Sequence, residues 1–169
     1  MASSYEYFKN DIKEYIKEHF DTDSKILDVG AGAGTYKKLL EEYKMDAVEV
    51  FEPNIREHNL ESMYEHVFNT DIKDFMYDYY DLIIFGDIIE HLDVKEATEV
   101  LKYAYNRCKE MIVAVPYNYK QGIEYGNVYE IHKQDDLTNE IFLERYPFMK
   151  LLYKNDYYGY YVKGEQVWN

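Results

Sequence analysis

Cysteine and long apolar runs are nearly absent from this sequence. Cys108 is the single cysteine, so an intrachain disulfide is excluded, and we expect it to be a buried thiol on a helix. The sequence has no run of about 18 apolar residues and no apolar signal segment near its first residue. These absences exclude a membrane-spanning helix and predict a cytoplasmic protein without a membrane partner.

Positive charge is also scarce, because 19 lysines and arginines face 33 aspartates and glutamates, for a net charge of −14. Such a chain repels polyanions, which argues against long DNA or RNA as a partner. The 169 residues suffice for one domain, residues 1–169, with a proper core. Aromatic residues make up 18% of the chain, which favours a folded globular protein over a disordered one.

Apolar strands alternate with amphipathic helices along the chain. Because strands separated by helices pair in parallel, the order predicts an α/β fold with a mostly parallel sheet. The last two strands are too close for a helical crossover, so the C-terminal strand is expected to be antiparallel. The predicted helices are Tyr5–Phe20 (within 1–22, lying on the core), Tyr36–Tyr43, Val94–Cys108 and Leu137–Tyr146, and the predicted strands are Ile26–Val29, Met45–Phe51, His66–Phe68, Asp81–Gly86, Met111–Val115, Leu151–Lys154 and Tyr157–Lys163.

A glycine-rich turn follows the first predicted strand, in the order Asp28-Val-Gly30-Ala31-Gly32-Ala-Gly34. Glycines let the backbone turn tightly and let a ligand lie against main-chain N–H groups. The dinucleotide pattern G-x-G-x-x-G would need a glycine where Thr35 stands, and no phosphate-binding G-x-x-x-x-G-K-[ST] occurs. An acidic residue beside the glycines suits a cofactor that carries positive charge.

This turn, with acidic residues after later strands, resembles that of the class I S-adenosylmethionine-dependent methyltransferases, over roughly positions 25 to 162. The resemblance implies a Rossmann-like, doubly wound sheet. It implies S-adenosylmethionine as cofactor and S-adenosylhomocysteine as product. It also implies that Gly30, Ala31, Gly32 and Gly34 lie under the methionine half, while Asp28 helps to hold the amino group.

Acidic side chains stand at the ends of the next two predicted strands, where open α/β sheets bind their ligands. A carboxylate at Glu49 can accept hydrogen bonds from both ribose hydroxyls, and the resemblance assigns it that role, with Glu52 as second choice. Asp71 and Ile72 resemble the segment that receives adenine. The alternative for Asp71 is a helix N-cap, a position where Asp is common.

The fourth predicted strand ends in Gly86-Asp87-Ile-Ile-Glu90-His91, which resembles the Glu-His element of small-molecule O-methyltransferases. The resemblance implies that Gly86 and Asp87 lie beside the sulfonium and that Glu90 and His91 face the acceptor. A histidine has a pKa suited to a general base. The alternative for His91 is a histidine at a helix start that is bonded to the backbone.

The long segment 116–134 after the fifth predicted strand is expected to be an active-site loop, with His132 lining the pocket as a third catalytic residue. In quinone-biosynthetic O-methyltransferases and Hen-type RNA 2′-O-methyltransferases, a similar pattern holds a divalent cation. That resemblance would make Asp87, Glu90, His91 and His132 metal ligands. We do not favour a metal, because Asp87 stands where those families have a longer glutamate.

The pattern as a whole predicts transfer of a methyl group to oxygen of a small-molecule or glycan-type acceptor. The signature (D/N/S)-P-P-(Y/F) of amino-methyltransferases is missing after the fourth predicted strand, which argues against a nucleobase amine as acceptor. Two alternatives stay open: a catalytically silent module that binds the cofactor and a partner protein, and an NAD-dependent oxidoreductase. Neither the identity of the acceptor nor the oligomeric state follows from these patterns.

Overall fold

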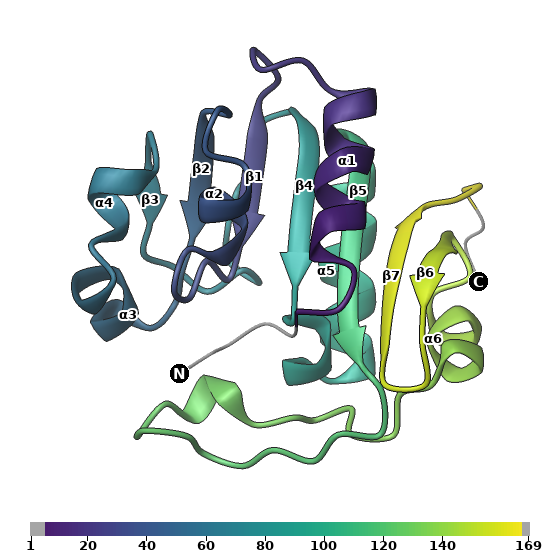
Figure 1. Cartoon of the computed structure of the whole chain (residues 1–169). Coiled ribbons are helices and arrows are strands. Elements are labelled where there is room, and N and C mark those ends of the chain that lie inside the picture. The colour runs from purple at the N-terminus through teal and green to yellow at the C-terminus, as the bar shows by residue number, and fades with distance from the viewer. Residues whose placement is uncertain (1–5, 167–169) are drawn as a thin grey trace.

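The computed structural model describes residues 6–166 of the chain, which form a seven-stranded sheet with helices on both faces (Figure 1). In chain order the elements are α1 (Lys9–His19), β1 (Ile26–Val29), α2 (Thr35–Leu39), β2 (Met45–Val48), α3 (Glu52–Glu57), α4 (Leu60–Met63), β3 (Val67–Phe68), β4 (Tyr80–Gly86), the 3-10 helix η1 (Ile89–His91), α5 (Val94–Tyr105), β5 (Cys108–Pro116), the 3-10 helix η2 (Val128–Glu130), α6 (Asn139–Arg145), β6 (Met149–Lys154) and β7 (Tyr158–Lys163).

The strand order is β3-β2-β1-β4-β5-β7-β6. All pairs from β3 to β5 are parallel, whereas β7 runs antiparallel to both β5 and β6. This confirms the predicted Rossmann-like, doubly wound sheet with its antiparallel C-terminal strand. The chain leaves β1 toward one edge and returns at β4 to build toward the other. The switch point between β1 and β4 is where such sheets form a ligand crevice.

Both faces of the sheet are buried, which explains the unbroken apolar runs of its central strands. In β4, Leu82 and Ile84 belong to the core on the α1 side, together with Ile12 and Ile16 of α1. The intervening Ile83 and Phe85 of β4 belong to the opposite core, with α5 and α6. Figure 1 shows α1 in front of the sheet and α5 behind it. The result is a three-layer arrangement that leaves the carboxyl ends of the strands accessible.

Cys108 was predicted on a helix, and this is wrong. Helix α5 ends at Tyr105, and Cys108 is the first residue of β5, where it pairs with Tyr80. Strand β5 is longer than its apolar run because pairing with β4 extends it toward the N-terminus. The thiol is buried, as expected, with 3% of the residue exposed.

The region after β2 differs most from the prediction. Strand β2 ends at Val48 rather than Phe51, because the Glu49 carboxylate accepts a hydrogen bond from the Phe51 N–H and turns the chain out of the sheet. Helices α3 and α4 follow, and neither was predicted, since six and four residues are too few to show a helical period. The other boundaries differ by a few residues.

The N-terminal helix starts at Lys9, after Phe8 in a left-handed conformation with φ of 60°. The predicted start at Tyr5 lies outside the described residues. Ile12 and Ile16 are fully buried against the sheet, so the helix covers one of its faces. Within residues 6–166, no helix combines the length and the apolar character needed to cross a membrane.

Candidate active site

The glycine-rich turn has the backbone conformation that its sequence requires. Gly30, Gly32 and Gly34 have φ values of 70°, 51° and 73°, a region that residues with a Cβ rarely adopt. At Gly30 a Cβ would also overlap the side chain of Ile88. The Gly30 N–H donates to the Val48 carbonyl at 2.8 Å, which ties the turn to the end of β2. The turn therefore presents bare backbone at the switch point.

Glu49 is joined to this turn through one carboxylate oxygen and to the segment after β2 through the other. Its Oε2 accepts from the Gly32 N–H and its Oε1 from the Phe51 N–H, each at 2.8 Å. The residue is 5% exposed, and burial raises the pKa of its carboxyl against the opposing effect of these two bonds. Glu49 lines the large cavity described below, so the predicted ribose-binding residue has access to a ligand.

Asp28 lies beneath the turn and does not line either cavity among the described residues. It is 1% exposed, and its Oδ2 accepts from the Tyr64 hydroxyl at 2.6 Å. Burial raises the pKa of Asp28 to about 7, against the lowering effect of that hydrogen bond. Gly34 also lies away from the cavities, close to Met63. The structure thus places these two predicted cofactor-binding residues behind the turn rather than at its surface.

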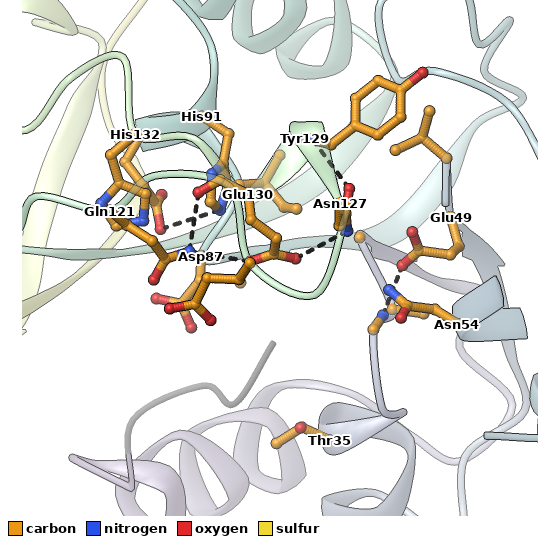
Figure 2. A pocket seen from close by; sticks show the side chains of 18 of the residues that line it. Thr35, Glu49, Asn54, Asp87, His91, Gln121, Asn127, Tyr129, Glu130 and His132 are labelled. Carbon is orange, nitrogen blue, oxygen red and sulfur yellow. Dashed lines mark hydrogen bonds and ion pairs between the residues drawn. The ribbon is translucent and has the colours of Figure 1, made fainter. Parts of the chain in front are cut away.

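A cavity of about 680 Å³ opens over the carboxyl ends of β1, β4 and β5 (Figure 2). The loop between β5 and α6 passes across this edge of the sheet in Figure 1. Figure 2 shows Glu49 and Asn54 on one side of the cavity and His91 and His132 on the other. Of the predicted site residues, the lining includes Gly30, Ala31, Gly32, Glu49, Gly86, Asp87, Glu90, His91 and His132.

A second cavity of about 300 Å³ shares Gly30, Ile88, His91 and other residues with the first, so the two adjoin. Its lining is largely apolar and includes both residues predicted to receive adenine, Asp71 and Ile72. The Asp71 carboxylate accepts from the Lys73 N–H at 2.9 Å. Asp71 therefore caps a turn. Because no helix follows it, the alternative that Asp71 is a helix N-cap is wrong.

Glu90 is the most unusual carboxyl group of the site. It is 1% exposed, and among the described residues neither of its side-chain oxygens has a hydrogen-bond partner. The His91 Nε2 lies 3.9 Å from its Oε1. Burial, reinforced by the negative charge of Asp87, raises the pKa of Glu90 well above its ordinary value. An acid of this kind is poised to receive a cation or a proton.

His91 and His132 meet at the loop side of the cavity, with ring centroids 4.8 Å apart. The His91 Nδ1 lies 3.3 Å from the Ile131 carbonyl, and the His132 Nδ1 lies 2.7 Å from the Tyr119 carbonyl. Because a carbonyl only accepts, each Nδ1 carries the proton and each Nε2 is left with a lone pair. Burial lowers the pKa of His91 to about 4 and lowers that of His132. Both rings are neutral at pH 7.

The loop is attached to this pair by backbone bonds that no sequence motif indicates. The N–H groups of Lys133 and Gln134 donate to the Glu90 carbonyl at 2.8 and 3.0 Å. The Gln134 side-chain amide donates to the carbonyls of Ile89 and Leu92. These contacts explain how His91 and His132, which are distant in the sequence, converge.

The ligand atoms of Glu90, His91 and His132 lie within 4.8 Å of one another, a set that a divalent cation accepts. The fourth residue implied by the metal-binding resemblance, Asp87, is outside this group, and its Oδ1 accepts from the Tyr158 hydroxyl at 2.6 Å. The donor set is therefore only partly assembled, and a metal stays the less favoured interpretation.

Sequence reasoning missed a buried lysine under the cavity. Lys9 of α1 is 7% exposed, and its Nζ donates to the hydroxyls of Tyr160 at 2.7 Å and Tyr36 at 3.2 Å. Tyr36 lines the cavity. Burial lowers the pKa of Lys9, while the negative charge of Asp87 raises it. The sequence did carry a signal for this burial: Lys9 precedes Ile12 by three positions and Ile16 by seven, so the three residues lie on the same buried face of the helix.

A methyltransferase domain family matches residues 1–120, which is more than half of the chain. The chain belongs to this methyltransferase family. Together with the fold and the solved structures that share it, this family membership makes the chain a class I S-adenosylmethionine-dependent methyltransferase. No curated protein has a matching sequence.

Solved structures share the fold of this methyltransferase at low sequence identity. An S-adenosylmethionine-dependent methyltransferase from Clostridium acetobutylicum is 13% identical, with a TM-score of 0.72 over 98% of this chain and 94% of that one. The magnesium protoporphyrin IX methyltransferase of Synechocystis, with bound S-adenosylmethionine, is 10% identical, with a TM-score of 0.66 over 94% and 78%. The 1,6-didemethyltoxoflavin-N1-methyltransferase of Burkholderia thailandensis, with its substrate and S-adenosylhomocysteine, is 14% identical, with a TM-score of 0.69 over 95% and 80%.

Proposed function

We propose that this methyltransferase transfers the methyl group to a hydroxyl oxygen of a small-molecule or glycan-type acceptor. The observation that carries the proposal is the state of His91. Its Nδ1 proton is engaged by the Ile131 carbonyl, so its Nε2 lone pair faces the large cavity beside Glu90. A hydroxyl needs a group that takes its proton as the methyl group arrives, and a positioned imidazole does this.

In the proposed arrangement the cofactor spans both cavities. Its methionine half lies over Gly30, Ala31 and Gly32, and its ribose binds the Glu49 carboxylate. Its adenine enters the smaller, apolar cavity beside Asp71 and Ile72, where apolar walls suit a flat base. Gly86 and Asp87 then lie near the sulfonium, whose positive charge the Asp87 carboxylate favours. Asp28, buried behind the turn, accepts from the Tyr64 hydroxyl rather than contacting the ligand.

For the transfer itself, the protein mainly has to position the two reactants and exclude water from the site. The acceptor oxygen attacks the methyl carbon in line, the carbon–sulfur bond breaks with its electron pair left on sulfur, and the hydroxyl proton goes to the His91 Nε2. The hydroxyl becomes strongly acidic as the new bond forms, so a base whose pKa is about 4 suffices. The Glu90 carboxyl, 3.9 Å away, stabilises the imidazolium in its ionised form. His132 and the loop close the acceptor side.

The proposal is tested by His91→Ala and His91→Gln. Both variants are expected to bind S-adenosylhomocysteine like the parent in calorimetry but to transfer labelled methyl groups to an acceptor panel roughly 100-fold more slowly or worse. His58→Ala, which changes a histidine outside the lining of either cavity, is the matched control and is expected to be active. Turnover that is unchanged in the His91 variants would instead support the silent binding module.

The expected organisation as one domain, 1–169, and a cytoplasmic location belong to the same proposal. The seven strands of residues 6–166 form one sheet, which supports the first. A chain with one buried cysteine needs no oxidising compartment, which supports the second.

A further inference from the structure

The large cavity is lined by six carboxyl groups. They belong to Glu6, Glu49, Asp87, Glu90, Glu124 and Glu130, and no lysine or arginine of residues 6–166 is part of its lining. A ligand that brings anionic groups into this space would be repelled.

The cofactor accounts for only part of this charge. Glu49 is tied to the glycine turn, and Asp87 stands at the proposed sulfonium end. The remaining acids come from separate segments: Glu6 precedes α1, Glu90 lies in η1, and Glu124 and Glu130 lie on the loop. These four acids line the same cavity.

Glu90 supplies the second, independent observation. Its carboxyl is 1% exposed and lines the cavity, and neither oxygen has a hydrogen-bond partner within residues 6–166. A buried carboxyl without partners is costly, so such groups are normally found opposite a donor. Glu130 is held in place by the side-chain amides of Gln121 and Asn127, at 3.1 and 3.3 Å. Its orientation is therefore fixed before a ligand arrives.

We propose that the acceptor carries protonated amines, as an amino sugar or an amino alcohol does, and that Glu90 binds the ammonium group next to the methylated hydroxyl. This rests on the proposed O-methyltransferase function and narrows its substrate class. An ammonium group forms charge-assisted hydrogen bonds with carboxylates. The rings of Tyr119, Tyr125 and Tyr129, which also line the cavity, accept a cation on their faces.

A divalent cation is the rival ligand for Glu90, and the arrangement of the acids argues against it as the full explanation. The compact group of ligand atoms holds Glu90, His91 and His132 only. Glu6, Glu124 and Glu130 lie outside it, so one metal ion leaves three acids without a role. An organic cation with several amines uses acids that are spread around about 680 Å³.

The test compares three glucose-derived disaccharides that differ in charge. The protein, saturated with S-adenosylhomocysteine, is titrated by calorimetry with three compounds. They are the β-1,4-linked disaccharide of glucosamine, which carries two ammonium groups, neutral cellobiose, and cellobionic acid, which carries a carboxylate. We expect the diammonium sugar to bind at least tenfold more tightly than cellobiose, and cellobionic acid to bind more weakly than either. Glu90→Gln and, separately, Glu124→Gln are expected to reduce this preference, by about tenfold for Glu90→Gln. Glu99→Gln, an exposed change on α5, is the control.

The inference is overturned if the three sugars bind alike or fail to bind, or if Glu90→Gln and Glu124→Gln both keep the full preference. It is also overturned if Mg²⁺ alone shifts the melting temperature through Glu90 and abolishes the effect of the diammonium sugar. Binding of S-adenosylhomocysteine distinguishes failure of this inference from failure of the proposed function. If it persists while the charge preference is missing, only this inference fails; if it is lost, the proposed function fails as well.

Discussion

At the scale of single residues, burial decides what the acidic groups of the site do. Asp28, Glu49 and Glu90 are each at most 5% exposed, and burial raises the pKa of all three. They differ in their hydrogen-bond partners: Glu49 accepts from two backbone N–H groups and Asp28 from one tyrosine hydroxyl, whereas Glu90 has no partner in the part of the chain that the structure describes. The sequence shows three acids near strand ends. Only the packed structure shows that Glu49 is bonded to the backbone, that Asp28 is buried against a tyrosine, and that Glu90 is open to a ligand.

Asp28 gives a pH-dependent stability that can be measured. Its ordinary pKa of 3.8 rises to about 7 in the folded protein, so folding favours the protonated form. The contribution of protonated Asp28 to the free energy of unfolding is fully present below about pH 4. It is lost as the pH rises toward and through 7. Asp28→Asn keeps a partner for the Tyr64 hydroxyl and cannot ionise. In urea unfolding, we expect the variant to gain stability relative to the parent between pH 4 and pH 8.

The control for this experiment is Asp23→Asn, an exposed change before β1. Its difference from the parent protein is expected to stay constant across the same pH range. If Asp28→Asn gives an equally flat difference, then the Asp28 carboxyl titrates normally in the folded state. The buried position described here would then be incorrect.

At the scale of elements, the long apolar strands were predictable and the short pieces were not. Strands β4 and β5 are buried on both faces, so their unbroken apolar runs identified them, and the close spacing of β6 and β7 identified the hairpin. Helices α3 and α4 are too short to have a period. The meeting of His91 with His132 depends on backbone bonds between the loop and Glu90, which side-chain patterns do not encode.

Helix α1 contributes a lysine to the support of the site, and its contribution to stability can be tested. Lys9→Ala removes the donor to the Tyr160 hydroxyl and the packing of a buried side chain. We expect the free energy of unfolding to fall by about 1 to 3 kcal/mol. Lys13→Ala, on the same helix and less buried, is expected to change it by less than about 0.5 kcal/mol. Urea denaturation of both variants measures the difference, and equal effects would contradict the role assigned to Lys9.

At the scale of the whole molecule, the sheet order places the glycine turn, Glu49 and the Glu-His element at one edge, across the switch point between β1 and β4. The sequence predicted this convergence because the carboxyl ends of parallel strands share an edge. It did not predict that Asp28 faces away from the cavity or that Lys9 lies beneath it. Both depend on which side of a chain segment meets the core. Six acidic residues line this cavity, whereas no lysine or arginine of residues 6–166 does.

The most direct test of the account is a calorimetric titration of the purified protein with S-adenosylmethionine and S-adenosylhomocysteine. We expect one site per chain, affinity weakened at least tenfold by Glu49→Ala, and little change with Glu52→Ala, since Glu52 is outside both cavity linings. Absence of measurable heat and of any thermal shift at millimolar concentrations of both compounds would contradict the central claim that the turn at Gly30 and Gly32 binds this cofactor.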